Sequence, residues 1–188
     1  MWFPLSGTLS LIVLPDEQRQ VEAATVGREG AAIIPAALGS RVSGQQLIGQ
    51  MPGDAIGFGV ETFAKFVAES PRLREVVNGY AEAVYGQTAI VAACNAVHHL
   101  NQRCARWLLM SQDRADADTF ELKQELLAVM LGVQRPSVSI AAGTLQAAGL
   151  ITYRRGRITV LDREGLEEAA CSCYEQIRSE YSRLVPLD

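Results

Sequence analysis

Two groups of side chains in this 188-residue sequence could carry chemistry, and cysteine and histidine form the first. Cys94 and His98 are four residues apart, so a helix would present them on one face, with His99 and Cys104 nearby. Thiolate and imidazole are zinc ligands, but a structural zinc site needs several convergent ligands. Packing as buried side chains is the interpretation that we favour. A thiol- or metal-responsive regulator that uses Cys94, His98 and Cys104 is the alternative.

The other two cysteines form a Cys171-x-Cys173 pair, which is tighter than the spacing of the common zinc and redox motifs. We expect one of these thiols to be buried and the other to be exposed. The sequence therefore predicts no cofactor and no metal. It also contains no acid/base pair, nucleophile motif or phosphate-binding loop that would indicate an enzyme.

Basic residues form the second group, and they cluster although the chain carries a net charge of -4. From Lys123 to Arg163 there are six basic residues, opposed only by Glu125 and Asp162. A basic segment in an acidic chain indicates a site for a polyanion. A solvated basic face is the alternative interpretation.

The elements that would position these basic side chains are predicted by residues 119–160. A first helix should stop at Gly132, because glycine favours the turn that ends a helix. A second helix should begin near Gln134, with Pro136 in its first turn, and should stop at Gly149. Two short strands around a tight turn at Arg155-Gly156 predict a β-hairpin. Helix, turn, helix and hairpin wing, in that order, are typical of a winged helix-turn-helix.

In such a fold the first turn of the second helix enters the major groove of DNA. Arg135 lies at that turn, and arginine can hydrogen-bond to both acceptors of a guanine edge. Other basic and polar side chains would bind phosphates and so position the protein. The predicted DNA-binding residues are Lys123, Gln124, Gln134, Arg135, Ser137, Ser139, Arg154, Arg155 and Arg157. A helical hairpin that contacts another protein through its arginines is the alternative.

The N-terminal third and the middle of the chain have different patterns. Residues 1 to about 60 alternate and are punctuated by glycine, as in short strands of a barrel, roll or sandwich. From Ser70-Pro71 onward, apolar residues recur every three or four positions, which predicts a long helix that pairs with a second copy. Packing of this helix on its own β-domain is the alternative. The predicted seam is Leu73, Val77, Tyr80, Val84, Gln87, Val91, Cys94, His98 and Asn101.

The sequence thus predicts an α+β fold with a partial antiparallel β-roll, a long dimerisation helix and a C-terminal winged helix-turn-helix. We expect these parts to cover residues 1–70, 71–112 and 113–188, with a polar, turn-prone boundary at residues 111–118. No apolar run approaches the roughly 18 residues that a membrane span needs. The N-terminus lacks the basic start of a signal peptide, so we expect a cytoplasmic protein without membrane contact.

Several of these segments closely resemble the Crp/Fnr family of bacterial transcription regulators, in the family's own order and over nearly the whole chain. The resemblance implies a DNA-binding regulator that acts as a homodimer on double-stranded DNA and that contacts RNA polymerase. The segments that resemble the family's helix-turn-helix are residues 131–138, 145–151 and 155–160. Residues 103–109 resemble the end of its long helix. Residues 3–7 and 26–30 look like parts of its cyclic-nucleotide-binding-like roll.

Three departures from that family bear on what the chain senses and reads. The family's roll starts with further strands, so the chain is N-terminally short, which predicts an unpaired roll edge or a coding start upstream of Met1. Ala32 aligns with the glutamate that binds the ribose, and Gly39 to Gln45 offers no Arg-Ser pair for the cyclic phosphate. The resemblance also implies a second arginine that reads the groove and a glutamate that pairs with it. This chain has Ile140 in place of that arginine and Pro136 in place of that glutamate. We therefore expect a diverged sensor that binds no cyclic nucleotide.

Overall fold

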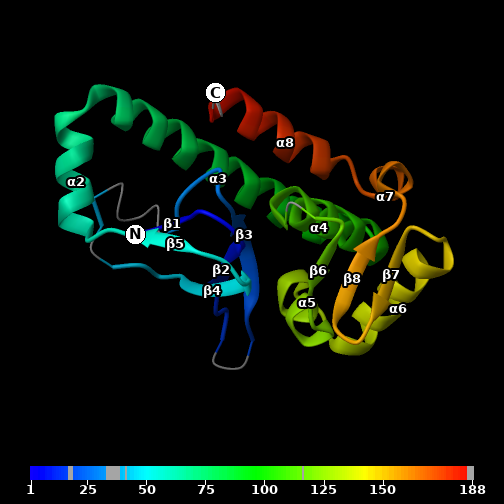
Figure 1. Ribbon diagram of the computed structural model, residues 1–188. Coiled ribbons are helices and arrows are strands. Elements are labelled where there is room, and N and C mark those ends of the chain that lie inside the picture. Colours follow the sequence, from blue (N-terminus) through cyan, green and yellow to red (C-terminus); the bar gives the residue numbers. More distant parts are fainter. Residues whose placement is uncertain (17–18, 33–38, 41, 116, 186–188) are drawn as a thin grey trace.

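A computed structural model of the chain describes residues 1–16, 19–32, 39–40, 42–115 and 117–185, and it confirms the predicted α+β class. Short strands gather at one end of the molecule beside a long helix, and the helix-turn-helix and its hairpin lie at the other end (Figure 1). Residue 41 of the Gly39 to Gln45 segment and residue 116 of the predicted boundary lie outside the described residues.

Five short strands in the N-terminal part form two antiparallel sheets. The alternation seen in the sequence gives β2 (Thr8–Val13) and β3 (Val21–Val26), and β2 lies between β3 and β4 (Gln46–Met51). In the second sheet β1 (Trp2–Pro4) pairs with β5 (Ala55–Gly57), which directly follows the segment Pro52-Gly53-Asp54. Within the described residues, β3 and β4 are the outer strands of the three-stranded sheet.

Three helices follow the strands: α2 (Val60–Glu69), α3 (Pro71–Val97) and α4 (Leu100–Ala115). Ser70 caps α3, since its Oγ accepts a hydrogen bond from the Leu73 N–H at 3.2 Å. The prediction of one helix through Asn101 is wrong at a single point. The chain leaves the helical conformation at His98, which has φ −98° and ψ 146°, and α4 then begins at Leu100.

The apolar seam of α3, predicted to pair with a second copy, is buried within the chain itself. Tyr80, Val84, Gln87 and Cys94 are all buried, and α8 (Cys173–Leu184) packs along α3. The Tyr181 Oη of α8 donates a hydrogen bond to Gln87 Oε1 at 2.7 Å. Intramolecular packing therefore explains these residues, and any contact between two copies through α3 must use another face.

The C-terminal part has the predicted order of helix, turn, helix and hairpin. Helix α5 (Gln124–Leu131) ends at Gly132, which has φ 63°, and α6 (Arg135–Ala147) is followed by Gly149, which has φ 77°. Strands β7 (Ile151–Arg154) and β8 (Arg157–Val160) form the hairpin, which we call the wing. Strand β6 (Thr119–Glu121), not predicted from the sequence, pairs with β8. Helix α7 (Arg163–Ala169) follows.

The predicted turn-prone segment 111–118 is helical in its first five residues, because α4 continues through Ala115. Ser111 and Gln112 are polar but buried, and each has a side-chain partner, so their polarity does not mark a loop. Gln112 Nε2 donates to Asp118 Oδ1 at 2.9 Å, and Gln112 Oε1 accepts from Arg163 Nη1 at the same distance. A buried polar residue with partners belongs in a helix as readily as an apolar one.

The largest hydrophobic core holds α4 against the helix-turn-helix and the wing. Fully buried side chains in this core include Trp107 and Leu108 of α4, Leu127 and Leu131 of α5, Val138 of α6, and Ile151 and Ile158 of the wing.

Taken singly, no helix among the described residues is long and apolar enough to cross a membrane. Helices α5 and α6 have the necessary length and apolar character only when they are taken together, as a pair bent by 100°.

A buried polar network attaches the three-stranded sheet to α4. Glu22 of β3 accepts a hydrogen bond at Oε2 from Trp107 Nε1 of α4 at 2.7 Å. Its Oε1 lies 2.6 Å from Ser10 Oγ of β2, which also lies 2.9 Å from Gln50 Oε1 of β4. Gln50 Nε2 in turn donates to Ser111 Oγ of α4 at 3.1 Å. The network thus joins all three strands to one helix.

With Gln50 oriented so that its Nε2 donates to Ser111, proton counting in this network favours a neutral Glu22. Ser10 has one hydroxyl proton but faces two acceptors, Glu22 Oε1 and Gln50 Oε1. If Glu22 is protonated, its carboxyl donates to Ser10 and Ser10 donates to Gln50, so that each group has a partner. Burial raises the pKa of Glu22, and hydrogen bonds from Ser10 and Trp107 oppose that shift only in part.

This raised pKa predicts how stability depends on pH. Protonated Glu22 favours the folded state, so its contribution is complete below the ordinary carboxyl pKa and is lost as pH rises through the raised, folded-state pKa. Glu22→Gln keeps a donor for Ser10 and an acceptor for Trp107 but cannot titrate. We expect this variant to gain stability relative to the wild type as pH rises, measured by urea denaturation over a pH series.

Glu22→Ala is the matched control for that experiment. It should cost about 1–3 kcal/mol at low pH, because the buried Trp107 N–H loses its acceptor, and its difference from the wild type should shrink as pH rises through the raised pKa of Glu22. An identical pH dependence in the wild type and in Glu22→Gln would contradict the assignment of a neutral Glu22.

Candidate nucleic-acid interface

The start of α6 places Arg135 where the sequence analysis expects a base-reading residue. Gln134 is the N-cap, Arg135 is the first helical residue, and Pro136 is the second, where its fixed φ suits a first helical turn. Ser139 and Gly143 follow Arg135 at intervals of four residues, so the three share one exposed face. The opposite face enters the core through Val138, Ala141, Ala142 and Leu145.

The exposed face of α6 carries two small residues, Ser139 and Gly143. Gly143 is exposed, and a Cβ added there would meet nothing within 4 Å. Because glycine in a helix interior costs about 1 kcal/mol relative to alanine, packing within the chain does not explain this residue. Ile140 is 71% exposed beside it. Next to Ile140, the small residues Ser139 and Gly143 leave room for another molecule to approach the helix backbone closely.

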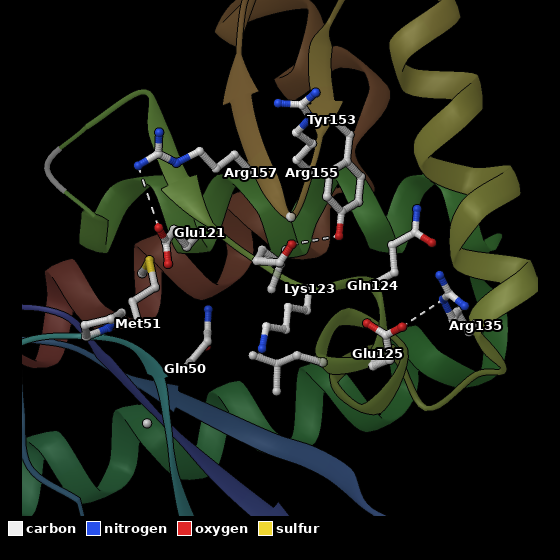
Figure 2. Close-up of a pocket in the computed structure, with 15 residues that line it drawn as sticks. Gln50, Met51, Glu121, Lys123, Gln124, Glu125, Arg135, Tyr153, Arg155 and Arg157 are labelled. Carbon is white, nitrogen blue, oxygen red and sulfur yellow. Dashed lines mark hydrogen bonds and ion pairs between the residues drawn. The ribbon is translucent and has the colours of Figure 1, made fainter.

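A cleft of about 840 Å³ separates this end of α6 from β4 (Figure 2). The Gln50 and Met51 side of the cleft belongs to β4, and the opposite side consists of the turn before α5, the start of α6 and the wing. The structure therefore brings part of the predicted set together. Of the predicted residues, Lys123, Gln124, Arg135, Arg155 and Arg157 line the cleft, whereas Gln134, Ser137, Ser139 and Arg154 are outside its lining.

Tyr153 also lines the cleft, and the sequence analysis missed it. Its Oη donates to the Leu122 carbonyl at 2.8 Å, and its backbone N–H donates to Gln146 Oε1 at 2.7 Å. Tyr153 therefore fixes the wing against the segment before α5. The alternation in β7 could have indicated a residue on this face, but the partner of its hydroxyl, Leu122, lies 31 positions away in the sequence.

Two of the predicted arginines form ion pairs within the chain. Arg135 Nε lies 3.0 Å from Glu125 Oε1, and Arg157 Nη2 lies 3.6 Å from Glu121 Oε1. All four side chains are more than half exposed, so these pairs contribute little to stability and a polyanion could displace the carboxylates. Lys123, Arg154 and Arg155 form no ion pair with any residue that the structure describes.

The tip of the wing holds an arginine in an unfavourable backbone conformation. Arg155 has φ 51° and Gly156 has φ 77°, as in the two-residue turn that suits a twisted hairpin. Among the described residues, Arg155 is the one non-glycine residue with a positive φ. Asparagine or glycine is preferred at such a position. The preference of the turn therefore does not explain why this position is an arginine.

One basic residue of the predicted segment does not belong to this surface. Arg163 lies 2.7 Å from Asp113 Oδ1 and 3.1 Å from Glu167 Oε1, and its Nη2 donates to Tyr174 Oη at 2.6 Å. These contacts bind α7 to the end of α4 and to α8. The excess of positive charge read from the sequence therefore includes one arginine with a structural role.

The cysteines are grouped differently from the expectation. Cys104 lies in the hydrophobic core, where burial raises the pKa of its thiol to about 12, and it is not part of a cluster with Cys94 and His98. Cys171 and Cys173 are both buried against those two residues instead. The prediction of one exposed thiol in the Cys171-x-Cys173 pair is therefore wrong.

Comparisons with known proteins agree with the geometry of this domain and with the fold. Residues 102–169 match the family model described as the Crp-like helix-turn-helix domain. A sequence comparison with curated proteins gives no match. The predicted resemblance to Crp/Fnr regulators is confirmed for this domain, and many solved structures of such regulators share the fold over most of the chain.

Three of these solved structures illustrate the likeness. A transcriptional regulator of the CRP family from Thermus thermophilus superimposes with a TM-score of 0.74 at 20% identity, covering 90% of this chain and 86% of that one. The c-di-GMP responsive global regulator CLP of Xanthomonas campestris gives 0.67 at 17% identity, with 85% and 83% covered. FixK2 from Bradyrhizobium japonicum gives 0.66 at 14% identity, with 90% and 86% covered.

Proposed function

We propose that this chain, which carries a Crp-like helix-turn-helix domain in the fold of the Crp/Fnr regulators, is a transcription regulator of that family and binds double-stranded DNA. The observation that carries the proposal is the exposed face of α6, where Arg135 precedes the small residues Ser139 and Gly143. An α-helix fits the major groove, and small side chains let its backbone approach the base edges.

The predicted DNA-binding residues divide into two roles. Arg135, at the start of α6, reads a guanine edge once it exchanges Glu125 for the DNA. Gln134, Ser137 and Ser139 supply further hydrogen bonds beside it. The side chains that bind phosphates are Lys123, Gln124, Arg154, Arg155 and Arg157.

Two substitutions separate these roles. Arg135→Ala should weaken binding to a selected operator by about 1–3 kcal/mol and relax the base preference at one position. Arg155→Asn should weaken binding to all sequences alike and reduce the slope of log affinity against log salt by about one. Fluorescence anisotropy with labelled duplexes over a salt series measures both effects.

Two controls belong with these variants. Asparagine suits the positive φ at Arg155, so Arg155→Asn should unfold at the same urea concentration as the wild type or a higher one, which excludes misfolding as the cause. Arg72→Gln removes an equally exposed charge at the start of α3, at the other end of the molecule, and should leave DNA affinity unchanged. If Arg135→Ala and Arg155→Asn keep wild-type affinity at fixed salt, the assignment of the interface is wrong.

We further propose that the regulator is a homodimer that uses the face of α3 opposite the buried seam. From Tyr85, which is 76% exposed, to Val97, which is 71% exposed, this face carries alanines and no charged residue. Exposed alanines occur there at Ala89, Ala92, Ala93 and Ala96. An apolar helical stripe that none of the described residues covers suits close packing against a copy of itself. The dimer would then present two copies of α6 about 34 Å apart to a two-fold-related site.

Ala92→Glu tests this dimer without disturbing the fold, because glutamate is a good helix former and the position is exposed. We expect the variant to sediment as a monomer at micromolar concentration, where the wild type is a dimer, since two buried carboxylates would face each other. Ala64→Glu, on the exposed face of α2, is the matched control and should stay dimeric. A wild type that sediments as a monomer contradicts the proposal.

The sensor part, we propose, does not bind a cyclic nucleotide. Ala32, at the position expected for a ribose-binding glutamate, is buried, and its backbone N–H donates a hydrogen bond to the Trp2 carbonyl oxygen at 2.8 Å. The nearby carboxylate of Glu29 is engaged by the Gly27 N–H at 3.0 Å and by Arg114 Nε at 2.7 Å. Titration calorimetry with cyclic AMP and cyclic GMP should show no heat of binding at physiological concentrations, because a buried phosphate needs a paired cation. Stoichiometric binding would overturn this proposal.

A further inference from the structure

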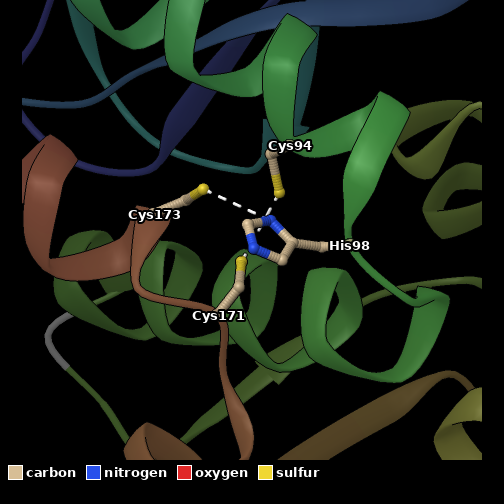
Figure 3. Close-up of side chains that lie close together, drawn as sticks. All are labelled: Cys94, His98, Cys171 and Cys173. Atoms are coloured by element: carbon tan, nitrogen blue, oxygen red, sulfur yellow. Dashed lines mark hydrogen bonds between the residues drawn. The ribbon is translucent and has the colours of Figure 1, made fainter.

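A compact group of four metal-binding side chains lies where α3 meets the connection between α7 and α8 (Figure 3). Cys94 is in the last turn of α3 and His98 is its C-cap, so both point from one helix end. Cys171 precedes α8, and Cys173 is the first residue of α8. Three of the four side chains are buried and His98 is half-buried. Segments more than seventy positions apart thus meet at one point.

The distances within this group suit a tetrahedral ion. Cys94 Sγ lies 3.4 Å from Cys171 Sγ, and Cys173 Sγ lies 3.5 Å from His98 Nδ1. All four donor atoms lie within 4.8 Å of one another. Zinc–sulfur bonds of about 2.3 Å and zinc–nitrogen bonds of about 2.0–2.1 Å place tetrahedral ligand atoms roughly 3.6–3.8 Å apart. The group therefore needs only small side-chain movements to close around an ion.

We propose that Cys94, His98, Cys171 and Cys173 form a structural zinc site. Three thiolates and one imidazole are a ligand set that structural zinc uses, and soft sulfur ligands disfavour magnesium and calcium. The thiols release their protons to solvent when the ion binds. With four protein ligands the site is closed to substrate, so the ion holds segments together and performs no reaction.

Buried positive charge beside the group provides an independent argument. A zinc ion with three thiolates and a neutral imidazole has one net negative charge. Arg103 and Arg106 of α4 are buried and lie close enough to the cysteines to interact with them electrostatically. Within the described part of the chain neither guanidinium forms an ion pair, and the Nε atom of each has no hydrogen-bond partner. An anionic metal complex would offset the charge of these arginines.

The site would fix the joint between α3 and α4. The helix breaks at His98 and His99, and α4 then enters the domain that matches the Crp-like helix-turn-helix. An ion bound to Cys94 and His98 on one side and to Cys171 and Cys173 on the other would clamp this break to α8. The clamp is a property of the folded chain alone, so it can be tested without DNA and apart from the proposed function.

The test is metal analysis of the full chain, purified anaerobically with a reductant and without chelators. We expect about one zinc per chain, since the four ligands complete one tetrahedral site. Cobalt substituted for zinc should show the visible absorption of tetrahedral coordination and thiolate-to-cobalt charge transfer. Chelator treatment should lower the melting temperature, because an ion that binds only the folded chain stabilises it.

Matched variants assign the ligands. Cys173→Ser and His98→Gln should lose most of the zinc and the charge-transfer absorption, whereas Cys104→Ala, a buried cysteine outside the group, should keep both. If a variant fails to fold, cobalt titration of the wild type still reports the number of thiolates bound. Absence of metal in the reduced wild type, even after incubation with zinc, would overturn the proposal. So would zinc that remains in both ligand variants, or a Cys94–Cys171 disulfide, shown by a two-hydrogen mass loss, in place of metal.

Discussion

The buried contact between Glu22 and Trp107 is the constraint on which the rest of the structure depends. It connects the edge strand β3 to the middle of α4, and Ser10, Gln50 and Ser111 extend it to the other two strands. A buried polar network is stable only when each member has its partner, so it permits one position of the sheet on the helix. Apolar packing alone would tolerate a shift of the sheet along α4. A second tie, Arg114 to Glu29 at 2.7 Å, fixes the end of the same helix.

Helix α4 also fixes the position of the helix-turn-helix and the wing. Its Trp107 and Leu108 are fully buried in the core that also contains Leu127 of α5 and Val138 of α6. The side of α4 that serves the sheet and the side that serves the helix-turn-helix are both buried, which explains why residues 103–112 are buried without interruption. The exposed face of α6 is therefore held relative to the sheet through a single rigid helix.

Residues that break local rules gather on the surface assigned to DNA. Arg155 occupies a conformation that suits asparagine or glycine, and Gly143 weakens a helix that alanine would strengthen. Neither residue is needed by the core, since both positions are exposed. Conflict between local preference and observed residue is expected at functional sites, where binding selects the side chain. These two residues therefore support the proposed interface without any appeal to other proteins.

The sequence predicts the helix-turn-helix well because its signals are local. Gly132, Pro136, Gly149 and the Arg155-Gly156 turn each define a boundary within a few residues of themselves. The β2 and β3 strands were predictable for the same reason, through their alternation.

The partner that covers the apolar seam of α3 could not be predicted from such local signals. An apolar seam shows that something covers the helix but not whether a copy of the chain or α8, about ninety residues later, provides the cover.

The cysteine and histidine side chains have the same limitation, and their arrangement shows how α3 serves three partners. Cys94 and His98 indicate half of a site by their spacing, but Cys171 and Cys173 complete it from a segment about seventy-five residues away. One side of α3 thus packs on the sheet and α8, the opposite apolar stripe is the face that we propose for a second copy, and the C-terminal end meets the cysteines. These surfaces converge at the break before α4. A change along α3 or at the cysteines would therefore reach α6 through the angle between α3 and α4, whereas the sheet acts on α4 directly through Glu22 and Trp107.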